Sequence, residues 1–283
     1  MPSISVVVPV HNGADALPVL LHALAQQRGV SQVEVVVVDN NSTDDTAALA
    51  AASPVVAHVV VETRPGSYAA RNAGWRASSG AVVAFTDVDC EPDPGWLATL
   101  VQAIEDGAEL AGGAVVPGPP PPGLWSGWWA AYDRTMYLDQ GDNVASNGFA
   151  ATANLAVRRE VLEELEGFDA ALASGGDLRF GRRAVAAGHC LVWVPSAVVL
   201  HRPRAGLRAT WSLWRRLGRG YGDLAARGEW PVPLRRDPVL RKPLAAVVAR
   251  AREREVHTPW VVLAATHGLA RAAVLRGRLD AAR

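Results

Sequence analysis

Apolar residues form short continuous runs in the first hundred positions of the chain. Runs of this kind, in which polar and apolar residues do not alternate, are typical of strands that are covered on both faces in a parallel sheet. Four runs qualify, all of them rich in valine: Ile4 to Val10, Val33 to Val38, Val55 to Val61 and Ala81 to Phe85.

The segments between these runs have helical spacing. Leu17, Leu20, Leu21 and Leu24 recur at the interval of one helix face. A second helix is expected to begin at a Ser42 cap and to run to about Ala52, and a third to span Tyr68 to Ser78. Strands that alternate with helices predict βαβ units, and hence an α/β fold with a mostly parallel sheet flanked by helices.

Polar residues follow the predicted strands. Asp39 ends the second run, and Asp87 and Asp89 come directly after the fourth. Ligands of open α/β sheets bind beyond the carboxyl ends of the strands, so these acids are expected to share one edge. Carboxylate oxygens suit Mg²⁺ or Mn²⁺, which usually share them with substrate phosphates.

Four segments together resemble the landmarks of family 2 glycosyltransferases, which have the GT-A fold. They occur in family order and are spread over nearly the whole length of residues 3–100: Ser5 to Asn12, Val35 to Asp44, Ala69 to Gly74, and Phe85 to Asp89. The resemblance implies a nucleotide-diphospho-sugar donor and a Mn²⁺ or Mg²⁺ cofactor.

The resemblance also implies a role for individual residues. Asp39 would recognise the nucleotide base, Arg71 would lie beside the nucleotide, and Asp87 and Asp89 would contact ribose and metal. In some members a histidine at the position of His201 completes the metal site, although a structural role is equally open for it. The implied donor-binding residues are Pro9, His11, Asn12, Asp39, Arg71, Asp87 and Val88, and the implied metal ligands are Asp89 and His201.

A Gly-rich turn at Ser174 to Gly176 leads into Asp177, which matches the family's general base. Many members have Glu-Asp at this point, whereas this chain has one acid followed by Arg179. A second interpretation is that Asp177 caps the helix that begins at Leu178. The two roles are compatible, and we assign Asp177 as the catalytic base.

A proline-rich connector divides the chain. Residues 117–123 contain five prolines, which predicts an extended and stiff segment. We expect a glycosyltransferase domain over residues 1–203, with a nucleotide-sugar half at 1–116 and an acceptor half at 124–203. A helical extension would follow at 204–283. Three indoles after the connector, Trp125, Trp128 and Trp129, either line an acceptor site or pack on the sheet.

Charge is distributed unevenly although the net charge is zero. Residues 201–283 hold 18 basic and 6 acidic residues, a net charge of +12. Within 204–222, Trp211 and Trp214 share a helical face, and arginines occupy much of the other side. Such a helix can lie on an anionic membrane surface, close over the active site, or pack on the domain with its arginines in water. Gly218, Gly220 and Gly222 are expected to weaken its end.

The two cysteines, Cys90 and Cys190, have no metal-binding spacing and fit a reducing cytoplasm. The start of the chain has no pattern of a signal peptide, and no apolar run is long enough to span a membrane. The expected location is therefore cytoplasmic, with peripheral attachment to the inner face of the membrane as an option.

These features predict an inverting, metal-dependent glycosyltransferase that moves a sugar to an acceptor hydroxyl on a lipid, a polysaccharide or a small molecule. No nucleic-acid partner is expected. One alternative is a sugar-nucleotide nucleotidyltransferase, although the segment from His11 to Asp15 lacks the basic, Gly-rich loop of such enzymes. Another is a non-catalytic binding module with the same fold.

Overall fold

The computed structural model describes residues 2–119, 123–204, 206–229 and 238–281. They form two compact units. The first comprises Met1–Val116, Asp139–Ala171 and Gly176–His201, and the second comprises Pro117–Leu138, Leu172–Gly175 and Arg202–Arg283. In the described part of the chain, no helix is both long and apolar enough to cross a membrane.

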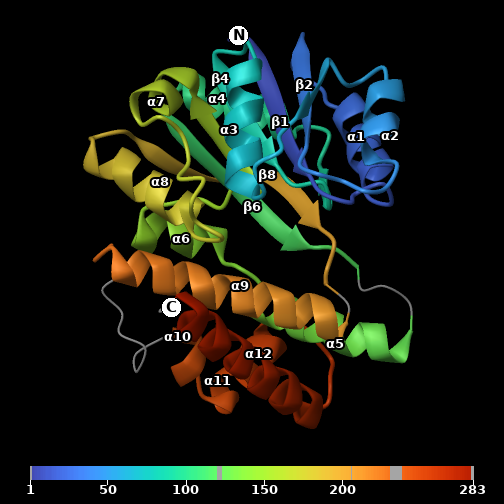
Figure 1. Ribbon diagram of the computed structural model, residues 1–283, viewed down its shortest axis with the longest axis vertical. Helices are drawn as coiled ribbons and strands as arrows, with labels where there is room; N and C mark the ends of the chain where they lie inside the picture. The colour runs from blue at the N-terminus through green and yellow to red at the C-terminus, as the bar shows by residue number, and fades with distance from the viewer. Residues whose placement is uncertain (1, 120–122, 205, 230–237, 282–283) are drawn as a thin grey trace. The chain divides into compact units, whose positions relative to one another are not determined.

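The first unit is built on one mixed sheet of eight strands in the order β3-β2-β1-β4-β7-β6-β8-β5 (Figure 1). Strands β1 to β4 are parallel where they pair, whereas β7 runs antiparallel to both β4 and β6. The predicted α/β class with a mostly parallel sheet is confirmed. The strand bounds are Ile4–Val10 (β1), Val33–Asp39 (β2), His58–Val61 (β3), Val82–Thr86 (β4), Cys90–Pro92 (β5), Leu110–Pro117 (β6), Asn154–Arg158 (β7) and Leu191–His201 (β8).

The helices of this unit are placed by the apolar stripes of their sequences. The four leucines of α1 are buried, and Pro18 is accommodated in its first turn. Helix α3 packs on β1 and β2, and it comes so close that a Cβ atom on Gly74 would clash with Val7 and Val38. The helices are Leu17–Ala25 (α1), Thr46–Ala52 (α2), Ser67–Ala77 (α3), Trp96–Glu105 (α4), Gln140–Asn147 (α6), Arg159–Glu164 (α7) and Gly176–Ala186 (α8).

A fully buried asparagine joins the antiparallel half of the sheet. Asn154 in β7 donates through Nδ2 to the carbonyl oxygens of Ala114 and Ala197, at 2.8 and 2.9 Å. Its Oδ1 accepts a hydrogen bond of 2.8 Å from the indole nitrogen of Trp96. Because a buried amide is costly unless it is hydrogen-bonded, this residue fixes β6, β7 and β8 in one arrangement.

The second unit is helical. Its helices are Leu124–Met136 (α5), Leu207–Ala226 (α9), Pro238–Arg241 (α10), Leu244–Glu253 (α11) and Trp260–Ala281 (α12). The apolar face of α9 packs into the core of this unit, where Trp214 is 7% exposed and lies against Tyr132. Arg208, Arg216 and Arg219 of this helix are exposed, and its contact with a membrane stays a prediction. The stretch that includes Pro231 and Pro233 lies outside the described residues.

Helix α9 continues through its glycines to Ala226, and the expectation that they weaken its end is wrong. The glycines lie where other parts of the chain pack closely on the helix. A Cβ atom on Gly218 would clash with the backbone of Val274 in α12, and one on Gly277 would clash with the backbone of α9 at Arg215. The two helices run in the same direction, side by side (Figure 1), with their backbones in direct contact.

Candidate active site

The strand order brings the sequence-predicted acids to one edge of the sheet. Strand β1 lies between β2 and β4, so the residues that follow these three strands are neighbours. Asp39 is the last residue of β2 and pairs with Val10 at the end of β1. Asp87 follows Thr86, the last residue of β4. The polar edge that was expected from the strand ends is therefore present.

Asp39 is 7% exposed, and its Oδ1 accepts a hydrogen bond of 3.2 Å from the backbone N–H of Ser42. Asn12, whose φ is 52°, accepts one of 2.7 Å from the N–H of Thr43. These bonds hold Ser42 and Thr43 in a loop. Helix α2 therefore begins at Thr46, and the prediction that Ser42 caps it is wrong.

Asn40 positions the loop that leads into α3, a role that the sequence analysis missed. Its Nδ2 donates to the carbonyl oxygens of Glu62 and Arg64, and its Oδ1 accepts from the N–H of Gly66 at 2.8 Å. The carbonyl of Asn40 lies 2.8 Å from Nδ1 of His11. Its place next to Asp39 was the only signal in the sequence.

Pro9 and Val88 lie at the same edge but offer no side-chain polar group. Pro9 is half-buried in β1 and pairs with Val38. The Val88 side chain covers Gly13, where an added Cβ atom would lie 3.0 Å from Val88 Cγ2. Both residues shape the surface beside the acids, and their assignment to donor binding stays a prediction.

Arg71 and Asp87 form a partly buried ion pair. Arg71 Nη2 lies 2.5 Å from Asp87 Oδ1, and the side chains are 5% and 30% exposed. Arg71 Nε is buried and has no hydrogen-bond partner among the described residues. A buried donor of this kind is costly unless a ligand accepts from it. Arg71 thus retains hydrogen-bonding capacity for an anion such as a diphosphate.

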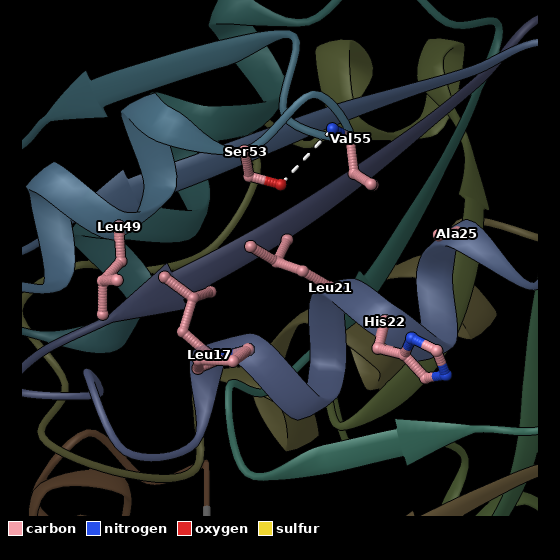
Figure 2. Close-up of a pocket in the computed structure, with 8 residues that line it drawn as sticks. Leu17, Leu21, His22, Ala25, Leu49, Ser53 and Val55 are labelled. Atoms are coloured by element: carbon pink, nitrogen blue, oxygen red, sulfur yellow. Dashed lines mark hydrogen bonds between the residues drawn. The ribbon is translucent and has the colours of Figure 1, made fainter.

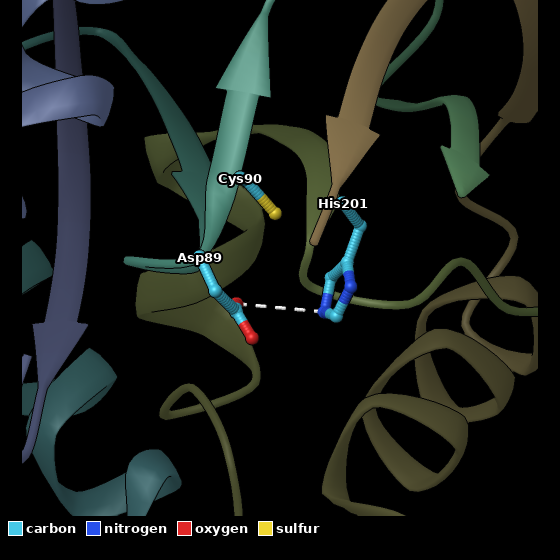
Figure 3. Close-up of side chains that lie close together, drawn as sticks. All are labelled: Asp89, Cys90 and His201. Atoms are coloured by element: carbon cyan, nitrogen blue, oxygen red, sulfur yellow. Dashed lines mark ion pairs between the residues drawn. The ribbon is translucent and has the colours of Figure 1, made fainter. Parts of the chain in front are cut away.

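Asp89, Cys90 and His201 converge because β5 pairs with β8, which places Cys90 opposite His201. Each of the three offers a ligand atom, and these atoms lie within 4.8 Å of one another. Asp89 Oδ1 is 3.4 Å from His201 Nε2, and Figure 3 shows the carboxylate and the imidazole facing each other. The carboxylate oxygen suits a hard cation such as Mn²⁺ or Mg²⁺, and the imidazole nitrogen suits a borderline one.

Asp177 lies in the first turn of α8, one residue inside the helix start at Gly176. Its Oδ1 accepts a hydrogen bond of 3.1 Å from the hydroxyl of Tyr68 and one of 2.9 Å from the N–H of Leu178. Arg179 pairs with Asp169 at 3.5 Å. The departure from the family pattern, an arginine soon after Asp177, thus has its own acidic partner.

A surface pocket between α1 and α2 is separate from these residues (Figure 2). It is lined by aliphatic side chains, among them Leu17, Leu21 and Leu49, with His22 at its side. Ser53 Oγ accepts from the N–H of Val55 at 3.3 Å, so this hydroxyl is already engaged. The pocket holds none of the acids of the strand edge, and we do not assign it to the site.

The family of the chain follows from comparison with known proteins. The profile of Glycosyl transferase family 2 matches residues 5–166, which include the strand edge, the Arg71–Asp87 pair and Asp89. This chain belongs to glycosyl transferase family 2. The resemblance seen in the four sequence landmarks is therefore confirmed, as is the assignment of the chain as a glycosyltransferase.

Two kinds of relative agree with this placement. Glycosyltransferase AglE of Haloferax volcanii is 35% identical over 212 residues, which are 72% of this glycosyltransferase and 68% of AglE. Mannosyltransferase PcManGT from Pyrobaculum calidifontis, solved in complex with GDP-Man and Mn²⁺, superposes with a TM-score of 0.64 at 21% identity, covering 99% of this chain and 87% of PcManGT.

A further structure, Staphylococcus aureus TarS 1-349 in complex with UDP-GlcNAc, superposes with a TM-score of 0.58 at 16% identity. The comparison covers 98% of this family 2 chain and 91% of that chain. At such identities the two solved structures establish the GT-A fold alone.

Proposed function

We propose that this glycosyltransferase is metal-dependent and inverting, and that it transfers a sugar from a nucleotide-diphospho-sugar to an acceptor hydroxyl. The observation that carries the proposal is a pair of neighbouring contacts at one edge of the sheet. Arg71 pairs with Asp87, and Asp89, two residues after Asp87, faces His201. This edge offers the buried guanidinium of Arg71 to a diphosphate, and it offers ligands to a hard metal ion beside it.

The donor site would begin at Asp39, whose carboxylate can accept from a base N–H, and would include His11 and Asn12 in the adjoining loop. PcManGT was solved with GDP-Man and TarS with UDP-GlcNAc, so nucleotide-sugars with either base fit the fold. Asp89 and His201 would hold Mn²⁺ or Mg²⁺, which supplies positive charge for the leaving diphosphate.

Asp177 would act as the general base. Its carboxylate takes the proton of the acceptor hydroxyl while the hydroxyl oxygen forms a bond to the anomeric carbon. The bond from that carbon to the diphosphate oxygen breaks, and the nucleoside diphosphate leaves with the electron pair. Attack from the face opposite the diphosphate inverts the anomeric configuration.

The variant Asp177→Asn tests this mechanism. An amide cannot take the proton, so kcat should fall by about 100-fold or more. The KM for the donor should stay the same, because donor binding is assigned to other residues. Transfer is measured as release of nucleoside diphosphate with a panel of hydroxyl acceptors, and Glu163→Gln, a neutralised exposed acid in α7, serves as the control.

Near wild-type turnover by Asp177→Asn would contradict the assignment of Asp177 as the general base. Release of pyrophosphate in place of nucleoside diphosphate would instead indicate a nucleotidyltransferase. Retention of the anomeric configuration in the product would contradict the inverting mechanism.

We also infer a membrane partner for the second unit, an anionic lipid surface. Arg208, Arg216 and Arg219 are exposed on α9, and the segment that contains them carries a net charge of +12. The inference does not use Trp214, which is buried in the helical core. Exposed apolar side chains, Leu207 at 54% and Trp260 at 63%, would add interfacial contact. A lipid-borne acceptor would then meet the enzyme at that surface.

A further inference from the structure

The hydrogen bond between Tyr68 and Asp177 joins two residues that lie more than a hundred positions apart in the chain. Tyr68 is 4% exposed, and its hydroxyl donates to Asp177 Oδ1 at 3.1 Å. We propose that Tyr68 is a positioning residue that orients Asp177 so that Oδ2 receives the acceptor proton. This inference rests on the proposed role of Asp177 as the base.

The two oxygens of Asp177 have different surroundings. Among the described residues, both hydrogen bonds found for this carboxylate end on Oδ1, one from the Tyr68 hydroxyl and one from the N–H of Leu178. A carboxylate with one oxygen engaged by two donors keeps a fixed orientation. The lone pairs of Oδ2 thus remain for the acceptor hydroxyl, and the proton goes to this oxygen.

The tyrosine ring is itself held in place. It stacks on Phe168 with a centroid distance of 5.9 Å, and Asn72 in the same helix fixes Phe168 through hydrogen bonds to its N–H and its carbonyl. On another side the ring lies against Gly176, where an added Cβ atom would be 2.7 Å from the ring. A glycine immediately before Asp177 is therefore what lets the hydroxyl reach the carboxylate.

The same helix face carries the donor side of the site. Tyr68 and Arg71 are three residues apart in α3, so they lie on one face. The guanidinium carbon of Arg71 is 5.5 Å from the centroid of the Tyr68 ring, and Arg71 pairs with Asp87. Helix α3 thus holds both Tyr68, which contacts the proposed base, and Arg71, which would face the diphosphate. Their fixed separation would keep the base and the donor in the orientation that the reaction requires.

The test is Tyr68→Phe, which keeps the ring, its stacking and its contact with Arg71, and removes only the hydroxyl. We expect kcat to fall about 10-fold, because a hydrogen bond to a charged group is lost. The KM for the donor should be unchanged, because Arg71 and Asp87 remain in place. Tyr132→Phe is the matched control: it removes the hydroxyl of another buried tyrosine, 3.0 Å from His267 in the second unit. We expect this control to keep the wild-type kcat.

A double variant separates positioning from a general structural effect. If Tyr68 acts through Asp177, Tyr68→Phe should lower the residual kcat of Asp177→Asn by less than 2-fold. An undiminished loss in that background would overturn the inference, as would a wild-type kcat for Tyr68→Phe or a change confined to the donor KM. In each of these cases the large loss of kcat expected for Asp177→Asn would leave the base assignment intact, so the two failures are distinguishable.

Discussion

The three side chains at the candidate metal site differ in what they can offer a cation. Burial raises the pKa of the Cys90 thiol well above its ordinary value, and the charges of Asp87 and Asp89 raise it further. Cys90 is 2% exposed, and it is a neutral thiol at neutral pH in the ion-free protein. The ligands that we propose, Asp89 and His201, offer a carboxylate oxygen and an imidazole nitrogen, which suit hard and borderline cations.

Replacing His201 by glutamine should weaken the binding of the metal ion and leave the proposed nucleotide site unchanged. In the wild-type protein, GDP or UDP together with Mn²⁺ should raise Tm more than either alone. In His201→Gln the Mn²⁺ concentration that gives half of this added shift should rise about 10-fold or more. A thermal-shift titration of Mn²⁺ at fixed nucleotide measures it.

His189→Gln is the matched control for this titration. His189 lies away from the site, and its Nδ1 is 2.7 Å from Glu109 Oε1. An unchanged Mn²⁺ midpoint in His201→Gln would show that His201 is a structural residue, which was the other interpretation of this histidine.

The placement of the acids was the part of the candidate site that the sequence predicted best. Asp39, Arg71, Asp87 and Asp89 were chosen from strand ends and family landmarks, and the structure brings them to one edge. The contact between Asp89 and His201 could not be derived from spacing, since it depends on the antiparallel pairing of β5 with β8. Tyr68 was read only as the start of a helix, because a hydrogen bond between distant segments has no local signal.

Among the elements, α9 and α12 differ from ordinary helix pairs in how close their backbones come. Side chains normally separate packed helices by 8–10 Å between axes. Here Gly218 and Gly277 allow a shorter distance between the helix axes, because each glycine lies against the backbone of the other helix. Glycine disfavours a helix by about 1 kcal/mol relative to alanine, so these positions give up intrinsic helix stability for contact area.

Gly277→Ala should therefore destabilise the protein by about 2–3 kcal/mol, since the added methyl group meets the backbone of α9 at Arg215. Gly268→Ala in the same helix should be neutral or stabilising, because an added Cβ atom there meets nothing within 4 Å outside the helix itself. Thermal or urea unfolding of the two variants gives the comparison. Equal stability of the two would contradict the backbone contact inferred for α9 and α12.

The boundaries of elements were predicted less well than their type. Helix α2 starts three residues later than the Ser42 cap implied, because the side chains of Asp39 and Asn12 hydrogen-bond the backbone of Ser42 and Thr43. The third strand, which was expected over Val55 to Val61, begins only at His58. No pattern in the sequence indicated that Pro117–Leu138 groups with the C-terminal helices, and the expected division after residue 203 stays a prediction.

For the molecule as a whole, the fold class and the family could be predicted because alternating strands and helices and four ordered landmarks agree with each other. The charge distribution is a separate property of the whole chain. Residues 1–100 carry 4 basic and 10 acidic residues, whereas residues 201–283 carry the net charge of +12. A chain with this division is expected to approach an anionic surface with its basic end.

Co-sedimentation with vesicles tests the proposed membrane contact. The protein should bind vesicles that contain phosphatidylserine and not those of phosphatidylcholine alone, and 0.5 M salt, about a 4 Å screening length, should release it. Arg216→Glu in α9 should lower the bound fraction several-fold, since each basic residue near the surface contributes about 1 kcal/mol. Arg28→Glu, an exposed arginine of the first unit, should not. Equal loss in both variants would refute a specific basic surface.

The pairing of β5 with β8 has a consequence for biosynthesis. Asp89 is translated early, whereas His201 belongs to the strand that completes the sheet. A nascent chain that has exposed only its first hundred residues carries Asp39 and Arg71, but only one of the two side chains that we propose as metal ligands. We therefore expect tight cation binding only after β8, the last strand in the chain, has joined the sheet.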